Sequence, residues 1–202
     1  CGKKREDYVV STKLFFSDAT NPNGFGISRK RVIEGINASL ERLQLDYVDI
    51  VFAQSPDDNT PLEESVLAFA QIVKEGKALY WGTSSWSPDR IIEAMSIADK
   101  YGVPGPVADQ CQYNLLNRDY MEKKYTYLFD KFGYGATTWS PVAGGLLTNK
   151  YFGDVDLSKT RFRFPPIMKI YSYDKYFYPE VKEASQKKWE QLAEIGKELG
   201  TD

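Results

Sequence analysis

The chain has 202 residues, of which 42% are hydrophobic and 27% are charged, so it is long enough to bury a globular core. Its net charge of −2 and pI of about 5.4 exclude the basic footprint that nucleic acids and anionic membranes attract. Two distant cysteines, Cys1 and Cys111, provide neither a disulfide framework nor a metal-ligand cluster, which favours a reducing compartment. Histidine is absent, and no stretch approaches the roughly 18 apolar residues of a membrane span.

In chain order, five short β-rich runs alternate with segments of helical spacing. The expected strands are 8–12, 48–53, 78–81, 107–113 and 134–139. A helical stripe runs from Ile33 to Leu43 and another from Ile91 to Ala98. The segment 141–179 has no clean period, and its aromatic residues favour an ordered belt over a disordered loop. We expect a last amphipathic helix over 181–199.

Several helix boundaries carry local sequence signals. Thr60-Pro61-Leu62-Glu63 predicts a capping box in which Thr60 is the N-cap and Glu63 stands at N3. Ser87-Pro88 repeats the combination of cap and proline. Gly76, Gly102 and Gly133 stand where left-handed C-caps belong.

This strict alternation predicts an α/β fold with a parallel sheet covered by helices. A doubly wound nucleotide-binding sheet is disfavoured, because Gly24-Phe25-Gly26 lacks the third glycine of that turn and indicates a loop. The spacing fits the units of a (β/α)8 TIM barrel, which needs about 250 residues. We predict a single, incomplete barrel domain over residues 1–202, with about five to six β-α units. Because the chain begins at Cys1 and not at methionine, we expect a fragment that lacks both ends of the barrel.

In such a barrel the chemistry lies at the carboxyl ends of the strands. Each of these ends, taken singly, has an ordinary structural interpretation as a solvated, capping or core side chain. Five successive strands with polar or aromatic ends at one mouth favour a binding site instead, rich in amides and hydroxyls that suit a carboxamide and a ribose. The strand ends are Lys13, Gln54, Thr83-Ser84-Ser85, Gln110 with Gln112, and Trp139-Ser140.

Four stretches carry a resemblance to a known family: Ser11-Thr12-Lys13, Ser39 to Asp49, Trp81 to Ser84 with Trp86-Ser87, and Trp139 to Gly145 leading to Lys150-Tyr151. With them the chain resembles the aldo-keto reductases, most closely the cytoplasmic β-subunits of voltage-gated potassium channels. The resemblance implies a cytoplasmic oxidoreductase that binds NADPH or NADP+ and reduces an aldehyde or ketone by hydride transfer.

The resemblance also assigns catalytic and substrate positions. Lys13 matches the lysine that lowers the pKa of a proton-donating tyrosine, whereas the family's tyrosine and its aspartate partner lie upstream of this lysine, outside the chain. Gln54 stands where most members have histidine and channel β-subunits have asparagine. An amide can polarise a carbonyl but cannot carry a proton, so we expect slow turnover. Phe16 is either an apolar wall of the substrate site or part of the core.

The implied cofactor contacts cover both ends of NADPH. Ser84 and Gln110 match the pair that holds the nicotinamide carboxamide, and Trp139 matches the aromatic residue that stacks on the nicotinamide ring. Arg163 competes with Arg161 as a phosphate-binding cation, and Ser85 departs from the arginine usual in channel subunits. The remaining matched positions, for the pyrophosphate and the adenosine phosphate, are Ser140, Pro141, Val142, Ala143, Gly144, Lys150, Tyr151 and Arg161.

Three functions remain open at this stage. The first is an NADPH-dependent reductase of small carbonyl compounds, and the second is an NADPH-binding regulatory β-subunit with little or no turnover. The third is a truncated product with neither role. The resemblance implies the cytoplasmic part of a potassium channel as a partner and a homo-oligomer, a tetramer in the family. Neither a nucleic acid nor a metal ion is expected.

Overall fold

A computed structural model describes residues 2–16, 21, 23–148, 150–151, 155–164, 168, 170 and 179–200. The chain divides into two compact units, Cys1–Gln112 with Asp119–Trp139, and Tyr113–Arg118 with Ser140–Asp202. The expectation of one domain over the whole chain stays a prediction. Cys1 and much of the expected belt over 141–179 lie outside the described residues.

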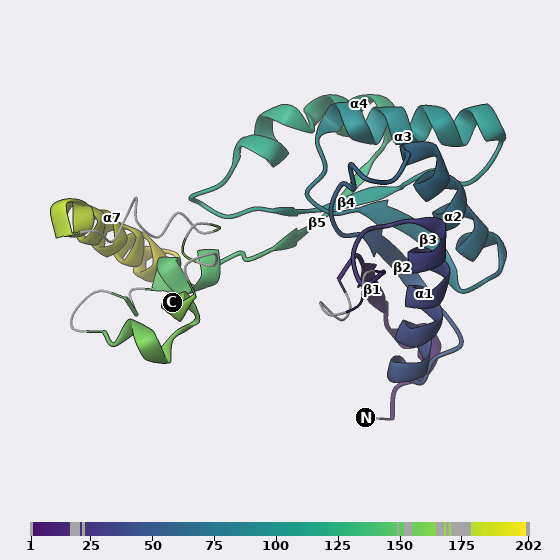
Figure 1. Cartoon of the computed structure of the whole chain (residues 1–202). Coiled ribbons are helices and arrows are strands. Elements are labelled where there is room, and N and C mark those ends of the chain that lie inside the picture. The colour runs from purple at the N-terminus through teal and green to yellow at the C-terminus, as the bar shows by residue number, and fades with distance from the viewer. Residues whose placement is uncertain are drawn as a thin grey trace. The chain divides into compact units, whose positions relative to one another are not determined.

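The first unit is built on a five-stranded parallel sheet in the order β1-β2-β3-β4-β5 (Figure 1). Its strands are β1 (Ser11–Leu14), β2 (Val48–Ala53), β3 (Ala78–Thr83), β4 (Ala108–Gln112) and β5 (Gly135–Trp139). The intervening helices are α1 (Arg29–Leu43), α2 (Leu62–Lys74), α3 (Pro88–Tyr101), the π-helical turn η2 (Tyr120–Lys124) and α4 (Thr126–Phe132). Strands and helices in strict sequential alternation confirm the predicted α/β fold, as in an incomplete (β/α)8 barrel.

The first strand begins later than expected. The run 8–12 was expected to be extended, whereas β1 begins at Ser11 and the 3-10 turn η1 (Arg5–Asp7) precedes it. The Asp7 side chain accepts a 2.9 Å hydrogen bond from the Lys4 amide and closes this turn. The pairing with β2 nevertheless reaches Val10, whose carbonyl accepts a 2.9 Å hydrogen bond from the Asp49 amide.

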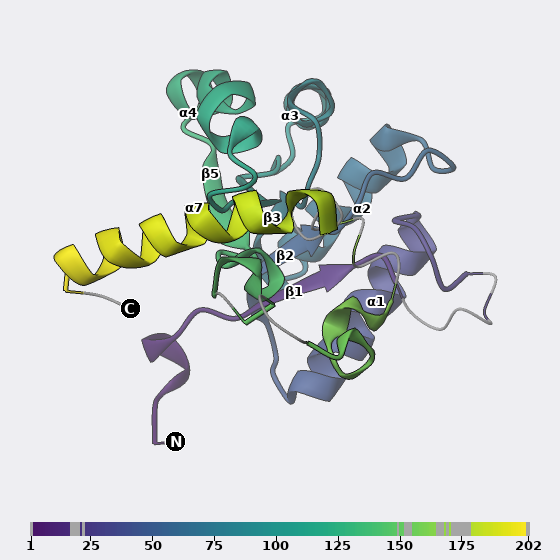
Figure 2. The same cartoon turned by 90° about the vertical axis from the view of Figure 1, so that its left-hand side faces the viewer.

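Helices α1 to α4 follow one another around the sheet, as the turned view in Figure 2 shows. Apolar side chains from these helices pack on the strands and form one buried core. Phe69 of α2 stacks on Trp81 of β3 with ring centroids 5.1 Å apart. Other fully buried side chains of this core are Trp86, Tyr125, Ile91, Ile72 and Leu128.

The two faces of the sheet have different surroundings. Leu14 is buried toward α1, where its side chain lies beside Gly35. Because successive side chains of a strand point to opposite faces, Lys13 lies on the other face and is exposed there. The same alternation separates Asp109, which is buried, from its half-buried neighbour Gln110. The strands therefore send polar side chains to the face that the helices of this unit leave open.

The helix caps differ from expectation at one point. The predicted capping box of Thr60 is wrong, because α2 begins at Leu62 after Pro61 and the Thr60 hydroxyl donates instead to Asp57 at 2.8 Å. Ser87 is the N-cap of α3 with proline at N1, as predicted, although its side chain makes no cap hydrogen bond. The three expected glycines at 76, 102 and 133 all have φ between 59° and 74°.

The described residues of the second unit include short 3-10 turns and a long helix. The turns are η3 (Ala143–Thr148), η4 (Leu157–Lys159) and η5 (Arg161–Arg163), and the helix is α7 (Pro179–Glu198), which confirms the predicted final helix. Trp189 of α7 is buried and its indole N–H donates to the Leu146 carbonyl. None of the helices in the described parts of the chain combines the length and apolar character that a membrane crossing requires.

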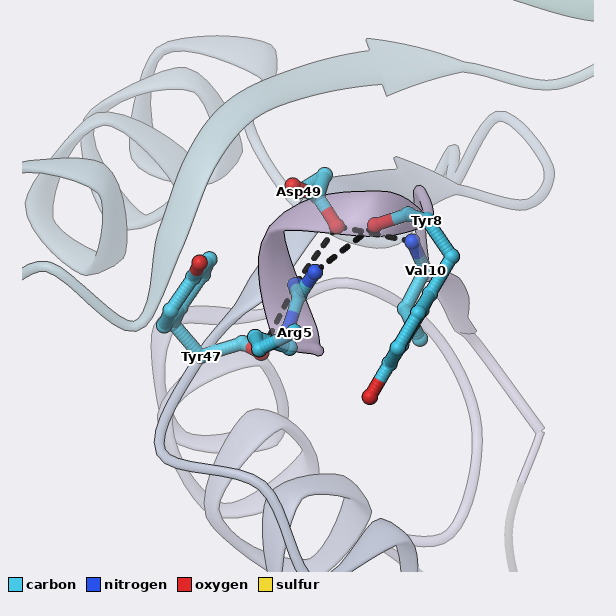
Figure 3. Close-up of polar contacts among 5 residues, drawn as sticks. All are labelled: Arg5, Tyr8, Val10, Tyr47 and Asp49. Atoms are coloured by element: carbon cyan, nitrogen blue, oxygen red, sulfur yellow. Dashed lines mark hydrogen bonds and ion pairs between the residues drawn. The ribbon is translucent and has the colours of Figure 1, made fainter. Parts of the chain in front are cut away.

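An ion pair ties η1 to the start of β2, at the edge opposite the strand carboxyl ends (Figure 3). Arg5 donates to Asp49 at 2.5 Å and lies over the Tyr47 ring, 4.2 Å from its centroid. The Val10 amide donates to the same Asp49 oxygen at 2.7 Å. Although burial raises the pKa of Asp49, the hydrogen bonds from Val10 and Arg5 outweigh it, so the pKa is lowered from 3.8.

Asp49→Asn should lower the midpoint of thermal unfolding by several degrees at pH 7. The lowered pKa means that the ionised carboxylate contributes stability above pH 3.8, and this contribution is lost as the pH falls through the still lower folded-state pKa. The difference between variant and wild type should therefore shrink on acidification. Circular dichroism melts from pH 7 to pH 2.5 measure it, with the exposed Asp46 of the same turn changed to Asn as the control. A constant difference at every pH contradicts the prediction.

Candidate active site

Lys13 and Gln54 lie at the ends of neighbouring strands. The Gln54 amide donates to the Leu14 carbonyl at 3.1 Å, so the parallel ladder continues one residue past β2 and places Gln54 beside the end of β1. Gln54 is half-buried and Lys13 is exposed on the open face. Desolvation by the surrounding strands lowers the pKa of Lys13, and the charge of Asp109 opposes this shift. A cation and an amide thus stand at the ends of adjacent strands.

The expected carboxamide pair is brought together by β3 and β4. The Ser84 hydroxyl donates to the main-chain carbonyl of Gln110 at 2.8 Å, and Ser84 itself is buried. The Gln110 side chain donates to the Thr137 hydroxyl of β5 at 3.2 Å. A hydroxyl and an amide fixed next to each other provide both the donor and the acceptor that a carboxamide requires.

Trp139 belongs to the same cluster of strand ends. Its indole N–H donates to the Ser85 hydroxyl at 3.4 Å, which holds the half-buried ring toward the end of β3. Ser85, whose role the sequence left in doubt, therefore positions the aromatic residue expected to stack on the nicotinamide. A serine in place of the longer arginine leaves this contact possible.

Phe16 belongs to an exposed aromatic cluster after β1. Its ring is 54% exposed and meets Phe25, 48% exposed, edge to face with centroids 5.6 Å apart. Phe15 packs on Phe16 from the other side at 4.8 Å, and Arg31 of α1 donates to the Phe16 carbonyl at 2.9 Å. The exposure argues against the core interpretation of Phe16, and its role as a wall of the substrate site stays a prediction. Phe25 was not expected from the sequence, because it lies nine residues later in a loop.

Asp57 is a structural residue that the sequence did not identify. Its buried carboxylate accepts hydrogen bonds from the Ile27 amide at 2.9 Å, the Asn59 amide at 3.0 Å and the Thr60 hydroxyl. Its carbonyl accepts from Arg90 of α3 at 3.1 Å. Asp57 therefore ties together the loops that follow β1 and β2 and the start of α3. It thereby supports the sheet edge at which Gln54 lies.

Within the second unit, the predicted phosphate loop has an unusual backbone. Ser140 and Ala143 have φ of 57° and 50°, and Gly144 and Gly145 follow with φ of 68° and 99°. The Ser140 carbonyl accepts hydrogen bonds from the Ala143 amide at 2.9 Å and from the Asn114 side chain at 3.0 Å. Pro141 and Val142 are exposed, whereas Ala143 and Gly144 are buried. Such left-handed turns collect backbone amides in a concavity that suits an anion.

A cationic pocket of about 330 Å³ lies in the same unit. Its lining residues are Lys150, Tyr151, Val155, Lys159, Thr160 and Arg161. Arg163 does not line it and instead lies over the Phe164 ring, 4.6 Å from the centroid, which favours Arg161 of the two candidates. Lys150 packs across Gly145, where a Cβ would overlap its Cε. Lys159 is a third cation that the sequence did not single out, because charge alone does not separate it from solvated lysines.

The described residues bring together no group of three or more His, Cys, Asp and Glu side chains that could hold a metal ion. Their chemistry is that of hydrogen bonding, aromatic stacking and anion binding. In the first unit the hydroxyl and amide groups suit a carboxamide, and in the second unit the cations suit a phosphate.

The aldo/keto reductase family model matches residues 2–202, and the chain belongs to this family. Relatives that are named as potassium channel β-subunits are 44–54% identical to it. It is 54% identical over 151 residues to a protein of Schizosaccharomyces pombe, across 74% of this chain and 44% of that protein.

Two plant proteins are also similar. One from Oryza sativa subsp. japonica is 47% identical over 150 residues, which cover 74% of this chain and 45% of that protein. One from Arabidopsis thaliana is 44% identical over 161 residues, which cover 80% of this chain and 49% of that protein. All three relatives are provisionally named as voltage-gated potassium channel subunit beta. The chain spans about half the length of these curated relatives.

Gly26→Ala should destabilise the first unit more than Gly76→Ala. Both glycines have positive φ, 90° and 74°, so each alanine costs about 1 kcal/mol of backbone strain. A Cβ at Gly26 would also overlap the Asp57 carboxylate, whereas Gly76 faces open space. The extra loss at Gly26 should be about 1–3 kcal/mol in urea unfolding. Equal losses for the two variants contradict the role of Asp57 as a loop anchor.

Proposed function

We propose that the protein is an NADPH-dependent reductase of small aldehydes and ketones with slow turnover. The observation that carries the proposal is the direct hydrogen bond between Ser84 and Gln110, at the strand edge that also carries Lys13 and Gln54. Membership of the aldo-keto reductase family supports the class of reaction. The catalytic and cofactor residues are proposed from the resemblance, and this geometry supports the proposal.

NADPH, when bound, supplies the hydride. Ser84 and Gln110 bind and orient the carboxamide, and Trp139 offers one ring face for stacking. Lys13 favours the ionised form of a neighbouring phenol and so eases proton delivery near neutral pH. Within 140–144 the amides of Val142 and Gly144 are proposed to bind the pyrophosphate, since Pro141 has no N–H and the Ala143 amide donates to the Ser140 carbonyl. Lys150, Lys159 and Arg161 attract the adenosine phosphate.

Gln54 sets the expected rate. Its amide N–H can donate to the substrate carbonyl oxygen, which polarises the bond, but it cannot release a proton in the way that an imidazolium can. Loss of a positioned acid or donor typically lowers the rate about 10²–10³-fold. The exposed rings of Phe16 and Phe25 favour substrates with an apolar or aromatic group next to the carbonyl.

A second candidate function is a cytoplasmic regulatory subunit. Two observations favour it: the names of the three relatives and the amide at Gln54. In this function, NADPH occupancy changes the activity of a voltage-gated potassium channel. Its partners are then the cytoplasmic part of such a channel and further copies of the same subunit, a tetramer by resemblance. Cofactor binding is common to both functions, and turnover separates them.

Lys13→Met should abolish single-turnover oxidation of bound NADPH by an aromatic aldehyde in the full-length protein. The physical reason is that the variant keeps the length of the side chain but removes the charge that stabilises a phenolate. NADPH affinity should change less than threefold. Absorbance at the nicotinamide band measures the rate, with the exposed Lys187→Met on α7 as the control.

Three results decide between the functions. Oxidation in the wild type that disappears in Lys13→Met supports the reductase. Tight NADPH binding without oxidation supports the regulatory subunit. If the wild type does not bind NADPH at all, both proposals are wrong.

Arg161→Gln should weaken binding of NADPH about tenfold or more and leave NADH affinity nearly unchanged. The reason is that a charge-assisted contact to the adenosine 2′-phosphate exists only in NADPH. Arg163→Gln, two residues away and outside the pocket, is the matched control and should leave both affinities unchanged. Fluorescence titration measures the two dissociation constants. A larger effect of Arg163→Gln would reverse the assignment.

A further inference from the structure

A buried carboxylate lies directly beneath the carboxamide pair. Asp109 of β4 has no exposed surface and precedes Gln110, so its side chain points to the helix side of the sheet while that of Gln110 points to the open face. Neither the sequence nor the reductase chemistry above gives Asp109 a role. A fully buried aspartate is uncommon unless hydrogen bonds hold it in place.

Three donors on both sides of Ser84 converge on this carboxylate. The Thr83 hydroxyl donates to Oδ2 at 2.7 Å, and the amides of Ser85 and Trp86 donate to Oδ1 at 3.0 Å and to Oδ2 at 3.2 Å. Burial raises the pKa of Asp109, while these hydrogen bonds oppose the rise. Tyr134 adds a further contact, since its hydroxyl lies 3.0 Å from that of Thr83.

The turn that Asp109 holds has a strained backbone. Ser85 has φ of 60°, a left-handed conformation that is uncommon for a residue other than glycine. Such a conformation persists only where the surrounding structure fixes it, and the Ser85 amide is fixed by Asp109. Ser84 is held from the other side as well, because its amide donates to the Ala53 carbonyl at 2.9 Å.

We infer that Asp109 is a positioning residue for nicotinamide recognition. Its carboxylate fixes the residues before and after Ser84, and Ser84 in turn donates to the carbonyl of Gln110. One buried side chain thus sets the orientation of both carboxamide-binding residues and, through the Ser85 hydroxyl, of Trp139. This inference rests on the proposed binding of NADPH.

The test compares two ligands on the full-length protein. NADPH carries the nicotinamide, whereas adenosine 2′,5′-bisphosphate carries only the adenosine phosphates expected at Lys150 and Arg161. Asp109→Asn should weaken the binding of NADPH about tenfold or more. It should change the affinity for adenosine 2′,5′-bisphosphate less than twofold. The exposed Asp130→Asn on α4 is the control and should change neither.

A second variant guards against misfolding. Thr83→Val removes one hydrogen-bond donor to the Asp109 carboxylate at nearly constant side-chain volume. It should cause a smaller loss of affinity, again for NADPH only. In protein that already carries Ser84→Ala, Asp109→Asn should weaken NADPH binding by a smaller factor. The logarithm of that factor should be less than half of its value in the wild type, because the two residues act through one contact.

The outcomes separate the inference from the proposed function. If the wild type binds neither ligand, the proposed function fails and this inference fails with it. If the wild type binds both but Thr83→Val and Asp109→Asn weaken both ligands equally, Asp109 is only a core residue and the inference alone is overturned. Full additivity with Ser84→Ala overturns it as well.

Discussion

Parallel pairing of consecutive strands is the constraint on which the first unit depends. Each strand of the sheet pairs with the next one in the sequence, so all five carboxyl ends meet at one edge. The ladder places Leu14 opposite Ala53 and Ala53 opposite Thr83, and the residues around this row are Lys13, Gln54 and Ser84. Main-chain hydrogen bonds of the ladder, such as those from Gln54 to Leu14 and from Ser84 to Ala53, thereby make neighbours of residues about 30–40 positions apart. A slip of one residue in any strand would exchange the buried and the open faces.

Two buried carboxylates fix the loops at this edge of the sheet, which carries Lys13, Gln54 and Ser84. Asp57 holds the loops after β1 and β2, and Asp109 holds the turn after β3. Both accept hydrogen bonds from main-chain amides that would otherwise be unpaired in the interior. An unpaired buried amide costs free energy of folding. Asp57 has a lowered pKa and Asp109 a raised one, although burial raises the pKa of both; Asp57, being less deeply buried, is dominated by its hydrogen bonds.

The proposed chemistry follows from which groups of the family's site this edge of the sheet keeps and which it lacks. It retains a lysine with a lowered pKa, a hydroxyl-amide pair and an aromatic ring, which together suit a nicotinamide cofactor. By the resemblance, Gln54 stands where most family members have an imidazole, and its amide keeps a hydrogen-bond donor but gives up a proton carrier. Cofactor binding with slow reduction is the combination that this set of groups favours, and the same set suits a regulatory subunit that reports cofactor occupancy.

The sequence by itself determined the strands and helices and which polar residues follow the strands. Its apolar runs and helical stripes predicted all five strands, and its motifs pointed to Lys13, Gln54 and Trp139, because periodicity and strand ends are local properties. Only the tertiary structure showed that Thr60 donates to Asp57 instead of capping α2, and that Asp109 anchors the turn around Ser84. These contacts join residues that compete for several partners, and only the packed fold decides which partner is within reach.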